Sequence, residues 1–328
     1  MMPASRIVRY DPALCAAPVF QPVWRGDRPK LNLKFTFSGV VWRWRGPEQL
    51  GIGEQTLLLV LLELAAEQFE ENGSADDASR HIESSLYDLT ESRRPRIARL
   101  TVSFYELCRR LGCSTGGSAM IQRRAELQRL CEVTVWARQP GGVEFQSRLL
   151  AWEVGDDQGV TVVLNWRLAD ILFGGQFSPV CLSERLSLRS ECARALHCAL
   201  SLRIRPGKTM AFHLDKLSTY IWADAGNGPR RGRIEHVGTE SPNAVAKRRR
   251  RKQMLSALSE ITALATWSVK TTVNGAVQFT RHPLVKGDAL STSRRTSPSA
   301  VRAMPTSGAL EADRVAPLAA GIWRMFSS

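Results

Sequence analysis

The basic run Lys247-Arg-Arg-Arg-Arg-Lys252 opens the stretch of sequence that decides the fold we expect. Ser241-Pro242 before the run offers a helix cap followed by proline at the first helical position. Apolar residues after the run recur at helical spacing on one face: Leu255, Leu258, Ile261 and Ala265. Asn274-Gly275, the strongest short turn signal, then separates Trp267-Ser-Val269 from Val277-Gln-Phe279 and predicts a β-hairpin. A basic helix followed by a hairpin is the second half of a winged-helix unit.

The residues upstream of the basic run complete this unit. Residues 190–203 predict a helix with an apolar inner face made of Cys192, Ala195, Leu196, Ala199 and Leu200. A short strand at 210–212 and a helix over 214–222 follow. An insertion rich in Gly, Pro and Arg, from Asp224 to Glu240, then interrupts the turn before the basic helix. Helix, strand, helix, helix and hairpin is the winged-helix order.

An earlier part of the chain predicts a first copy of the same order. Ser103 and Glu106 have capping-box spacing for a helix that stops at Gly112, and Ser118 can cap a second helix running to about Cys131. We expect this second helix to turn Ile121, Ala125 and Leu127 or Gln128 inward, and to point outward Gln122, Arg123, Glu126 and Arg129. The stretch 133–149, with a turn at 139–142, predicts the hairpin, and a third strand is expected at 160–164.

The N-terminal part predicts two strands, 31–37 and 40–44, and a long buried helix over 48–69, before a polar loop from Gly73 to Pro95. The expected fold class is α+β, with tandem winged-helix domains. We divide the chain into an N-terminal arm with short strands (1–45), a first winged helix (46–166), a second winged helix that is the main DNA reader (167–282) and a disordered tail (283–328).

The charge of the chain favours a polyanionic partner. There are 45 Lys and Arg residues against 31 Asp and Glu residues, which gives a net charge of +14. Nucleic acid is the commonest partner of such a chain, whereas a membrane partner would need a basic amphipathic helix placed as an anchor, which we do not find. The longest apolar run, Leu57–Leu62, is too short to span a membrane. Without a secretory signal or a Cys-x-x-Cys pair among the seven cysteines, we expect a cytoplasmic protein without disulfides.

Double-stranded DNA is the partner that the two units predict. In the second unit the candidate DNA-binding residues are those of the basic helix and its hairpin: Lys247, Arg248, Arg249, Arg250, Arg251, Lys252, Gln253, Ser256, Lys270 and Asn274. Of these, Arg249, Arg250, Lys252, Gln253 and Ser256 are expected to project away from the core. In the first unit they are Ser118, Gln122, Arg123 and Arg138. An ordinary solvated face, or a dimer or partner surface, explains the first set as well, because Glu126 would repel phosphate.

Catalytic, cofactor and metal sites are not expected. Arg205-Pro-Gly-Lys-Thr209 looks like the end of a phosphate-binding loop, but Leu202 stands where that loop needs a glycine. His197 lacks the spacing of a metal ligand and is read as a satisfied core histidine. Tyr220 lacks the histidine pair of a DNA-nicking site and is read as core. The chain is therefore not expected to be an enzyme.

The chain also resembles the RepC-type replication initiators of IncQ-like plasmids. The matching stretches are collinear and lie between Val8 and His282: residues 8–15, 24–26, 46–51, 105–107, 117–120, 206–209, 217–222, 248–253, Leu258 and 267–269. The insertion after Asp224 and the tail after Pro283 depart from the family pattern by their length.

The resemblance implies tandem winged helices that bind directly repeated sites, called iterons, in a plasmid origin. It further implies opening of an adjacent AT-rich duplex and admission of the plasmid's helicase and primase as partners; the sequence also allows a homodimer. A transcriptional repressor with the same architecture is the alternative. Short direct repeats beside an AT-rich segment would favour initiation, and a palindrome upstream of an operon would favour repression.

Overall fold

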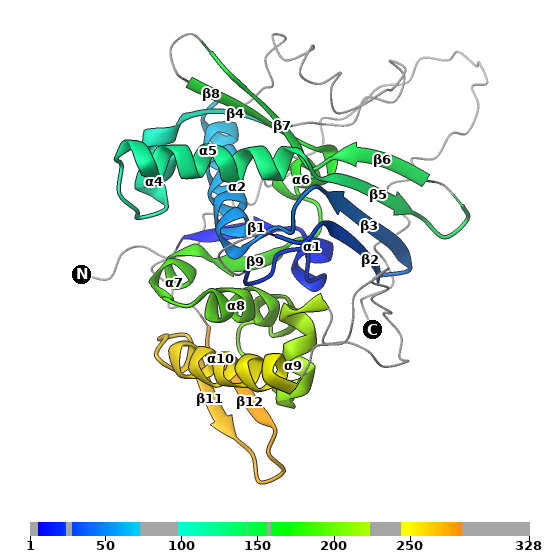
Figure 1. The fold of residues 1–328 in the computed structure, drawn as a ribbon, viewed down its shortest axis with the longest axis vertical. Coiled ribbons are helices and arrows are strands. Elements are labelled where there is room, and N and C mark those ends of the chain that lie inside the picture. Colours follow the sequence, from blue (N-terminus) through cyan, green and yellow to red (C-terminus); the bar gives the residue numbers. More distant parts are fainter. Residues whose placement is uncertain are drawn as a thin grey trace, which may run out of the picture. The chain divides into compact units, whose positions relative to one another are not determined.

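A helix that is buried on every side organises the chain. The computed structural model describes residues 6–23, 28–72, 98–142, 144–155, 159–223 and 244–283. Helix α2 (Ile52–Asn72) carries the apolar run Leu57–Leu62, and each of these six side chains is fully buried. A helix that is apolar all round must lie inside a protein, and α2 accordingly packs against α4, α5, α6 and α8 and against strands β1 and β4 (Figure 1).

Helix α2 begins four residues later than the sequence predicts. The expected start was Glu48, but Gly51 precedes the first helical residue, Ile52. The carboxylate of Glu54 accepts a hydrogen bond from the Gly51 backbone N–H at 2.9 Å, which satisfies a donor at the helix start. Among the described residues, no helix is both long enough and apolar enough to cross a membrane.

The first half of the chain arranges its elements around α2. Strand β4 (Ala98–Ser103), helices α4 (Phe104–Arg110) and α5 (Gly117–Cys131), and strands β7 (Leu150–Val154) and β8 (Gly159–Leu164) follow it in the chain. The three strands form one antiparallel sheet in the order β4-β8-β7. Helix α6 (Trp166–Leu172) then packs between α2 and this sheet.

The hairpin at 133–149 does not belong to this sheet, so the predicted first wing was wrong. Strands β5 (Thr134–Arg138) and β6 (Glu144–Arg148) extend β2 (Leu31–Phe37) and β3 (Val40–Gly46) into a four-stranded sheet of order β2-β3-β5-β6. The register places Ala137 opposite Trp42, so the buried residues of β5 cover the same apolar face as the β3 tryptophans. A local pattern predicts a hairpin but not the strand that it joins.

The second half repeats the order of the first. Helix α8 (Glu191–Arg203), strand β10 (Thr209–Phe212), helices α9 (Leu214–Ile221) and α10 (Ala244–Thr262), and strands β11 (Trp267–Thr271) and β12 (Val277–Arg281) follow one another. Their sheet has the order β10-β12-β11, which matches the first-third-second order of β4-β8-β7. The expected inner face of α8 is confirmed, because all five predicted residues are buried.

The N-terminal segment is tied into both halves. Strand β1 (Ile7–Tyr10) pairs antiparallel with β9 (Ser178–Cys181), and helix α1 (Pro12–Ala16) packs on α8. The strands expected at 31–37 and 40–44 are confirmed as β2 and β3. The insertion at 224–240, the loop at 73–95, the cap at Ser241-Pro242 and the tail from 284 onward lie outside the described residues.

One buried guanidinium joins the two halves. Arg185 of α7 (Leu182–Ser187) is fully buried and donates to Gln55 Oε1 at 2.7 Å and to Thr56 Oγ1 at 3.2 Å, both on α2. It also donates to the Arg194 carbonyl of α8 at 2.6 Å. Burial lowers the pKa of Arg185 to about 10, so the group stays charged at neutral pH and needs all three acceptors.

We expect Arg185→Ala to lower the free energy of unfolding by about 3 kcal/mol, because buried acceptors lose their donor and a cavity remains. Urea denaturation followed by circular dichroism measures the change. Arg189→Ala removes an exposed arginine nearby and should change stability by less than about 0.5 kcal/mol. Equal effects of the two substitutions would contradict the role of Arg185.

Candidate nucleic-acid interface

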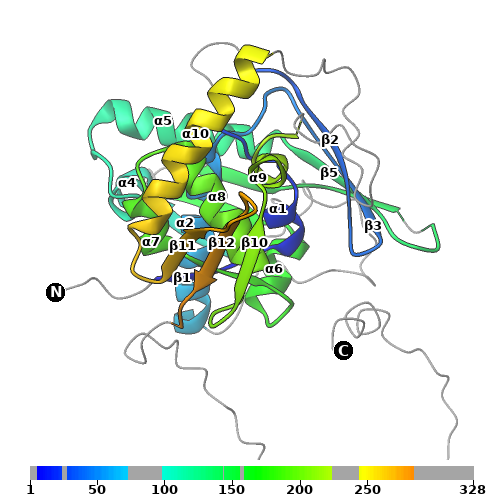
Figure 2. The same cartoon turned by 90° about the horizontal axis from the view of Figure 1, so that it is seen from below.

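Helix α10 turns one apolar face toward α8 and α9. Its buried residues are Met254, Ala257, Leu258 and Ile261. The predicted face was right for Leu258 and Ile261 but wrong for Leu255, which is 51% exposed, and for Ala265, which follows the end of the helix. Met254 and Leu255 are adjacent apolar residues, so the pattern allowed two faces. Packing against α8 selected the face with Met254, and Figure 2 shows α10 running across α8.

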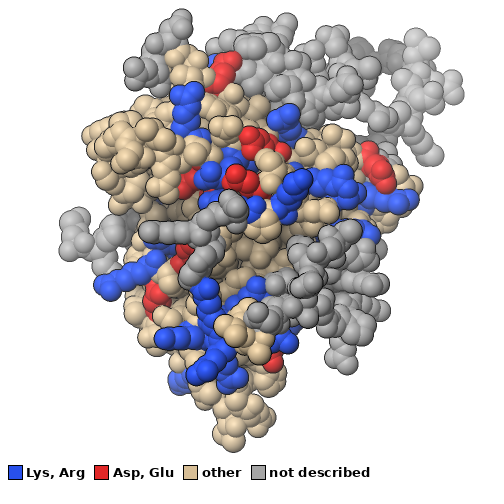
Figure 3. Space-filling model, viewed as in Figure 1, with Lys and Arg blue, Asp and Glu red and all other residues tan. Residues whose placement is uncertain are grey.

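The basic run occupies the first half of α10. Lys247, Arg248, Arg249, Arg251 and Lys252 are exposed, as is Ser256, while Arg250 and Gln253 are partly buried. Figure 3 shows basic side chains gathered over this part of the molecule. Helical geometry places Arg249, Lys252 and Ser256 on the side of α10 opposite its buried face. These three positions therefore lie on the outer side of α10.

Arg250 lies against the protein, so its predicted outward orientation was wrong. Arg250 precedes Met254 by one helical turn and shares its face. Its guanidinium lies 5.3 Å from the centroid of the Trp222 ring, which follows α9 and is buried. This contact holds the basic end of α10 against α9. Sequence reasoning missed the role of Trp222, although an indole ring is the preferred aromatic partner of an arginine.

The other end of α10 is fastened to the start of α8. The Glu260 carboxylate accepts hydrogen bonds from the backbone N–H groups of Arg189 at 2.6 Å and Ser190 at 3.1 Å. Ser190 is also the N-cap of α8, where its hydroxyl accepts from the Ala193 N–H. An acidic group at a helix N-terminus satisfies its unpaired donors and interacts favourably with the helix dipole. Helix α10 is thus fixed at both ends.

The hairpin beside α10 has the predicted turn. Gly275 has a φ of +71°, which a side chain would disfavour, and its N–H donates to the Thr272 carbonyl at 3.0 Å. Val273 at the tip is fully exposed, and Lys270 and Asn274 are exposed next to it. Figure 1 shows that the hairpin extends beyond α10. A basic helix and an exposed hairpin therefore lie on neighbouring elements, because α10 also packs on β11.

The base of the hairpin is hydrogen-bonded to a partly buried carboxylate, that of Glu184. Glu184 accepts hydrogen bonds from the Thr266 hydroxyl and from Trp267 Nε1, and lies 3.0 Å from His197 Nε2. Burial lowers the pKa of His197, although Glu184 opposes this. The imidazole is fully buried, as the predicted core position requires, but its Nδ1 has no hydrogen-bond partner among the described residues, so the prediction of a satisfied histidine was only partly right. Among the described residues, no group of three or more His, Cys, Asp or Glu could hold a metal ion. Tyr220 is half-buried between Phe212 and the guanidinium of Arg203.

Helix α5 of the first half presents a different surface. Gly116 is its N-cap, so the predicted cap Ser118 lies inside the first turn, where it is exposed together with Gln122. The predicted outward direction was wrong for Glu126 and Arg123, whose side chains are only 4% and 11% exposed, and the predicted inward direction was wrong for Ile121, which is 71% exposed.

Buried carboxylates bind two of the three arginines of α5, Arg123 and Arg129. Arg123 Nη2 lies 2.9 Å from Glu126 Oε1, and Arg129 Nε lies 2.6 Å from Oε1 of Glu54 on α2. Glu54 also pairs with Arg28 at 2.8 Å. A carboxylate taken out of water requires such partners, and this requirement outweighs the helical pattern.

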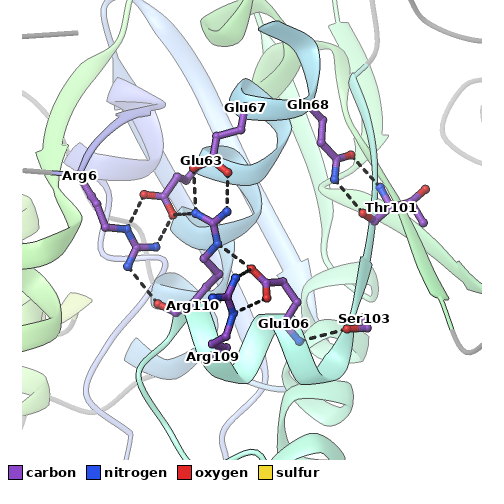
Figure 4. Close-up of polar contacts among 9 residues, drawn as sticks. All are labelled: Arg6, Glu63, Glu67, Gln68, Thr101, Ser103, Glu106, Arg109 and Arg110. Carbon is purple, nitrogen blue, oxygen red and sulfur yellow. Dashed lines mark hydrogen bonds and ion pairs between the residues drawn. The ribbon is translucent and has the colours of Figure 1, made fainter. Parts of the chain in front are cut away.

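Ion pairs between arginines and carboxylates also fix helix α4, and Figure 4 shows this network. The Ser103 hydroxyl accepts from the Glu106 N–H at 3.1 Å, as the capping-box spacing predicts. The Glu106 carboxylate is bound by Arg109 and Arg110, whose hydrogen bonds lower its pKa to about 2. Arg110 also holds Glu67 of α2 at 2.6 Å. The arginines of the first half that flank α2 are thus used in internal ion pairs.

Arg138 lies on the four-stranded sheet and not on a wing. It ends β5 and forms an exposed ion pair with Glu144 at 3.2 Å. The structure therefore brings together the predicted residues of α10 and of its hairpin. In the first half it does not, because Ser118, Gln122 and Arg123 lie on α5 whereas Arg138 lies on β5 of the four-stranded sheet.

Comparisons with known proteins place these features in a family. A family model described as Replication protein C (RepC) matches residues 5–283. No curated protein matches the chain. A solved structure of domains 2 and 3 of RctB shares 14% identity, covers 82% of this chain and 97% of its own, and superposes with a TM-score of 0.48. The Pi initiator protein in complex with iteron DNA shares 14% identity over 76% of this chain and 96% of its own, with a TM-score of 0.41.

We expect the stability of the protein to depend on Glu126 between pH 4.5 and 6. Burial raises the pKa of Glu126 from 4.5 to about 6, so the folded state binds this proton more tightly than the unfolded state. The contribution of Glu126 to the free energy of unfolding should therefore fall by about 2 kcal/mol as the pH rises through this window, and stay level above it. Urea denaturation at several pH values should show that Glu126→Gln loses this dependence.

Glu132→Gln is the matched control, because Glu132 directly follows α5 and its Oε1 accepts only from Gln128 Nε2, at the surface. This variant should keep the pH dependence of the unmodified protein. A Glu126→Gln variant that follows the same pH profile as the control would contradict the assignment.

Proposed function

Because the chain belongs to the replication protein C (RepC) family, we propose that it is a plasmid replication initiator that binds directly repeated duplex sites, the iterons, at an origin. The observation that carries this proposal is the exposed basic half of α10 beside the exposed β11–β12 hairpin. An α-helix fits into the major groove of a duplex, and a hairpin beside it can reach the neighbouring phosphates.

Both halves of the chain are winged-helix units in this proposal. The shared order of helix, strand, helix, helix and two strands supports it, with β7 and β8 as the two strands of the first half and with β5 and β6 inserted before them. The shared strand order of the two three-stranded sheets supports it as well. The second unit, with five exposed basic residues on α10, is the reader. In the first unit, Arg123 and Arg129 form ion pairs with buried carboxylates. This unit therefore contacts the duplex through Ser118 and Gln122.

Side chains on the outer side of α10 make two kinds of contact, one with base edges and one with phosphates. Arg249 can form a bidentate pair with the O6 and N7 atoms of a guanine, whereas Lys252 and Arg248 meet phosphates. Lys270 and Asn274 contact the backbone from the hairpin. Arg250 acts through its contact with Trp222, which positions the helix.

Opening of the duplex follows from binding and deformation of the DNA and not from nucleotide hydrolysis. The protein then admits a helicase and a primase to the open strands, in the cytoplasm where the plasmid replicates. Selection of bound sequences from random duplex DNA tests the proposal. Recovery of a site that occurs as direct repeats beside an AT-rich segment is the expected result, and recovery of a palindrome would replace initiation by transcriptional repression.

We expect Arg249→Ala to weaken binding of the selected duplex by about 1–3 kcal/mol and to relax the sequence preference at one position, because a base contact is lost. Lys252→Ala should weaken binding on all sequences and reduce the slope of affinity against salt by about one unit, as a phosphate contact does. Fluorescence anisotropy at several salt concentrations measures both effects.

Arg109→Ala provides the control for charge alone, since Arg109 is an exposed arginine of α4 that pairs with Glu106. Its effect on duplex affinity should be small. An Arg249→Ala, Lys252→Ala double variant that binds as tightly as this control would remove α10 from the interface.

A further inference from the structure

The four-stranded sheet has an outward face that no step of the proposed function uses. In its register, paired residues point to the same side of the sheet. Three rows cross the strands: Asn32, Arg45, Thr134 and Arg148; then Lys34, Arg43, Trp136 and Gln146; then Thr36, Val41, Arg138 and Glu144. None of these side chains is buried, while the alternate residues Leu33, Trp44 and Val135 are buried on the inward face.

The outward face is strongly basic. It carries Lys34, Arg43, Arg45, Arg138 and Arg148, and its one acidic residue is Glu144, which pairs with Arg138. Arg148 also donates to the Cys131 carbonyl at 3.3 Å. Figure 3 shows basic side chains gathered along β3 and β5. Such a surface attracts a polyanion over the full width of the sheet.

A tryptophan lies in the middle of these charges. Trp136 is half-exposed and is paired with Arg43 on one side and Gln146 on the other. Its Nε1–H donates to Gln146 Oε1 at 2.9 Å, which fixes the orientation of the indole. The guanidinium of Arg45 lies 5.6 Å from the ring centroid. Indole and guanidinium are the two planar groups on which nucleic-acid bases stack.

The basic residues and the half-exposed indole together favour one class of ligand over the alternatives. A tryptophan on a flat sheet cannot reach the stacked bases of a duplex, because no helix or hairpin carries it into a groove. A second copy of the sheet, face to face, would oppose like charges at short distance. Single-stranded DNA, in contrast, offers both free base faces and a chain of phosphates.

We propose that the outward face of β2-β3-β5-β6 binds single-stranded DNA, with Trp136 stacking on a base and with Arg43, Arg45 and Arg148 binding phosphates. The inference rests on the proposed function in one respect: opening of the origin duplex supplies the single strand. The face would then bind one separated strand while α10 remains bound to the neighbouring duplex.

The experiment compares full-length variants for binding to fluorescein-labelled oligo(dT) and to the selected duplex by anisotropy. Trp136→Thr, which keeps a residue suited to a strand, should weaken oligo(dT) binding about 5- to 100-fold, since one base stack is lost. Trp136→Phe should retain most of the affinity. Arg43→Gln with Arg45→Gln should weaken oligo(dT) binding and lower its salt dependence. Thermal melting confirms that each variant is folded.

The two interfaces can be separated by their variants. The Arg249→Ala, Lys252→Ala double variant should lose duplex affinity and keep its affinity for oligo(dT), and Trp136→Thr should show the reverse. If only the first of these results fails, the proposed duplex reader is wrong and the single-strand face stands.

Three results would overturn the inference. Unchanged oligo(dT) affinity of the folded Trp136→Thr variant would show that the indole makes no stack. An equal loss of duplex affinity would make the face part of the duplex interface. A loss of self-association in sedimentation, without a change in oligo(dT) affinity, would make it a contact between copies of the chain. The Arg109→Ala control should behave as the unmodified protein in every arm.

Discussion

Helix α2 has no polar side along Leu57–Leu62, so it has to be covered in every direction, and most of the architecture is a response to that requirement. Elements from both halves of the chain supply the cover. The polar residues at its start are buried with it and need partners, which come from distant segments: Arg129 for Glu54, and Arg185 for Gln55. Hydrophobic burial sets the position of α2, and these charged hydrogen bonds set which neighbours lie at its start.

Two groups of arginines in the described part of the chain differ in their surroundings. Arginines that flank α2 are bound to its carboxylates, as Arg110 is to Glu67. Helix α10 packs on α8 and α9 mainly through the apolar residues Met254, Ala257, Leu258 and Ile261, and five basic residues in its first half are exposed. They lie beside the hairpin, whereas Arg250 lies on Trp222. The arginines of α10 and those that flank α2 thus differ in how many of them are taken up by carboxylates.

Much of the second half could be predicted, since its signals are local. The cap at Ser190, the face of α8 and the glycine at 275 all act within one element or one turn. The predictions for the first half were less accurate. The hairpin at 133–149 was recognised but assigned to the wrong sheet, because its partner β3 is about ninety residues away in the chain. Arg123 lies inward and Ile121 outward, the reverse of the prediction, because Glu126 is buried and Arg123 pairs with it. Helical periodicity alone does not show which charged residue is buried.

By itself, the sequence determined the family, the basic character of α10, the class of most helices and strands, and the turn of the second hairpin. The family match runs over residues 5–283, and each of the other features depends on residues that are neighbours in the chain or one helical turn apart. Only the tertiary structure decided which face of α10 is outward, which arginines are used internally, and that Lys34, Arg43, Trp136 and Gln146 form one row across four strands. Burial of charge and pairing of strands join residues that are far apart in sequence, and no local pattern encodes the partner of such a contact.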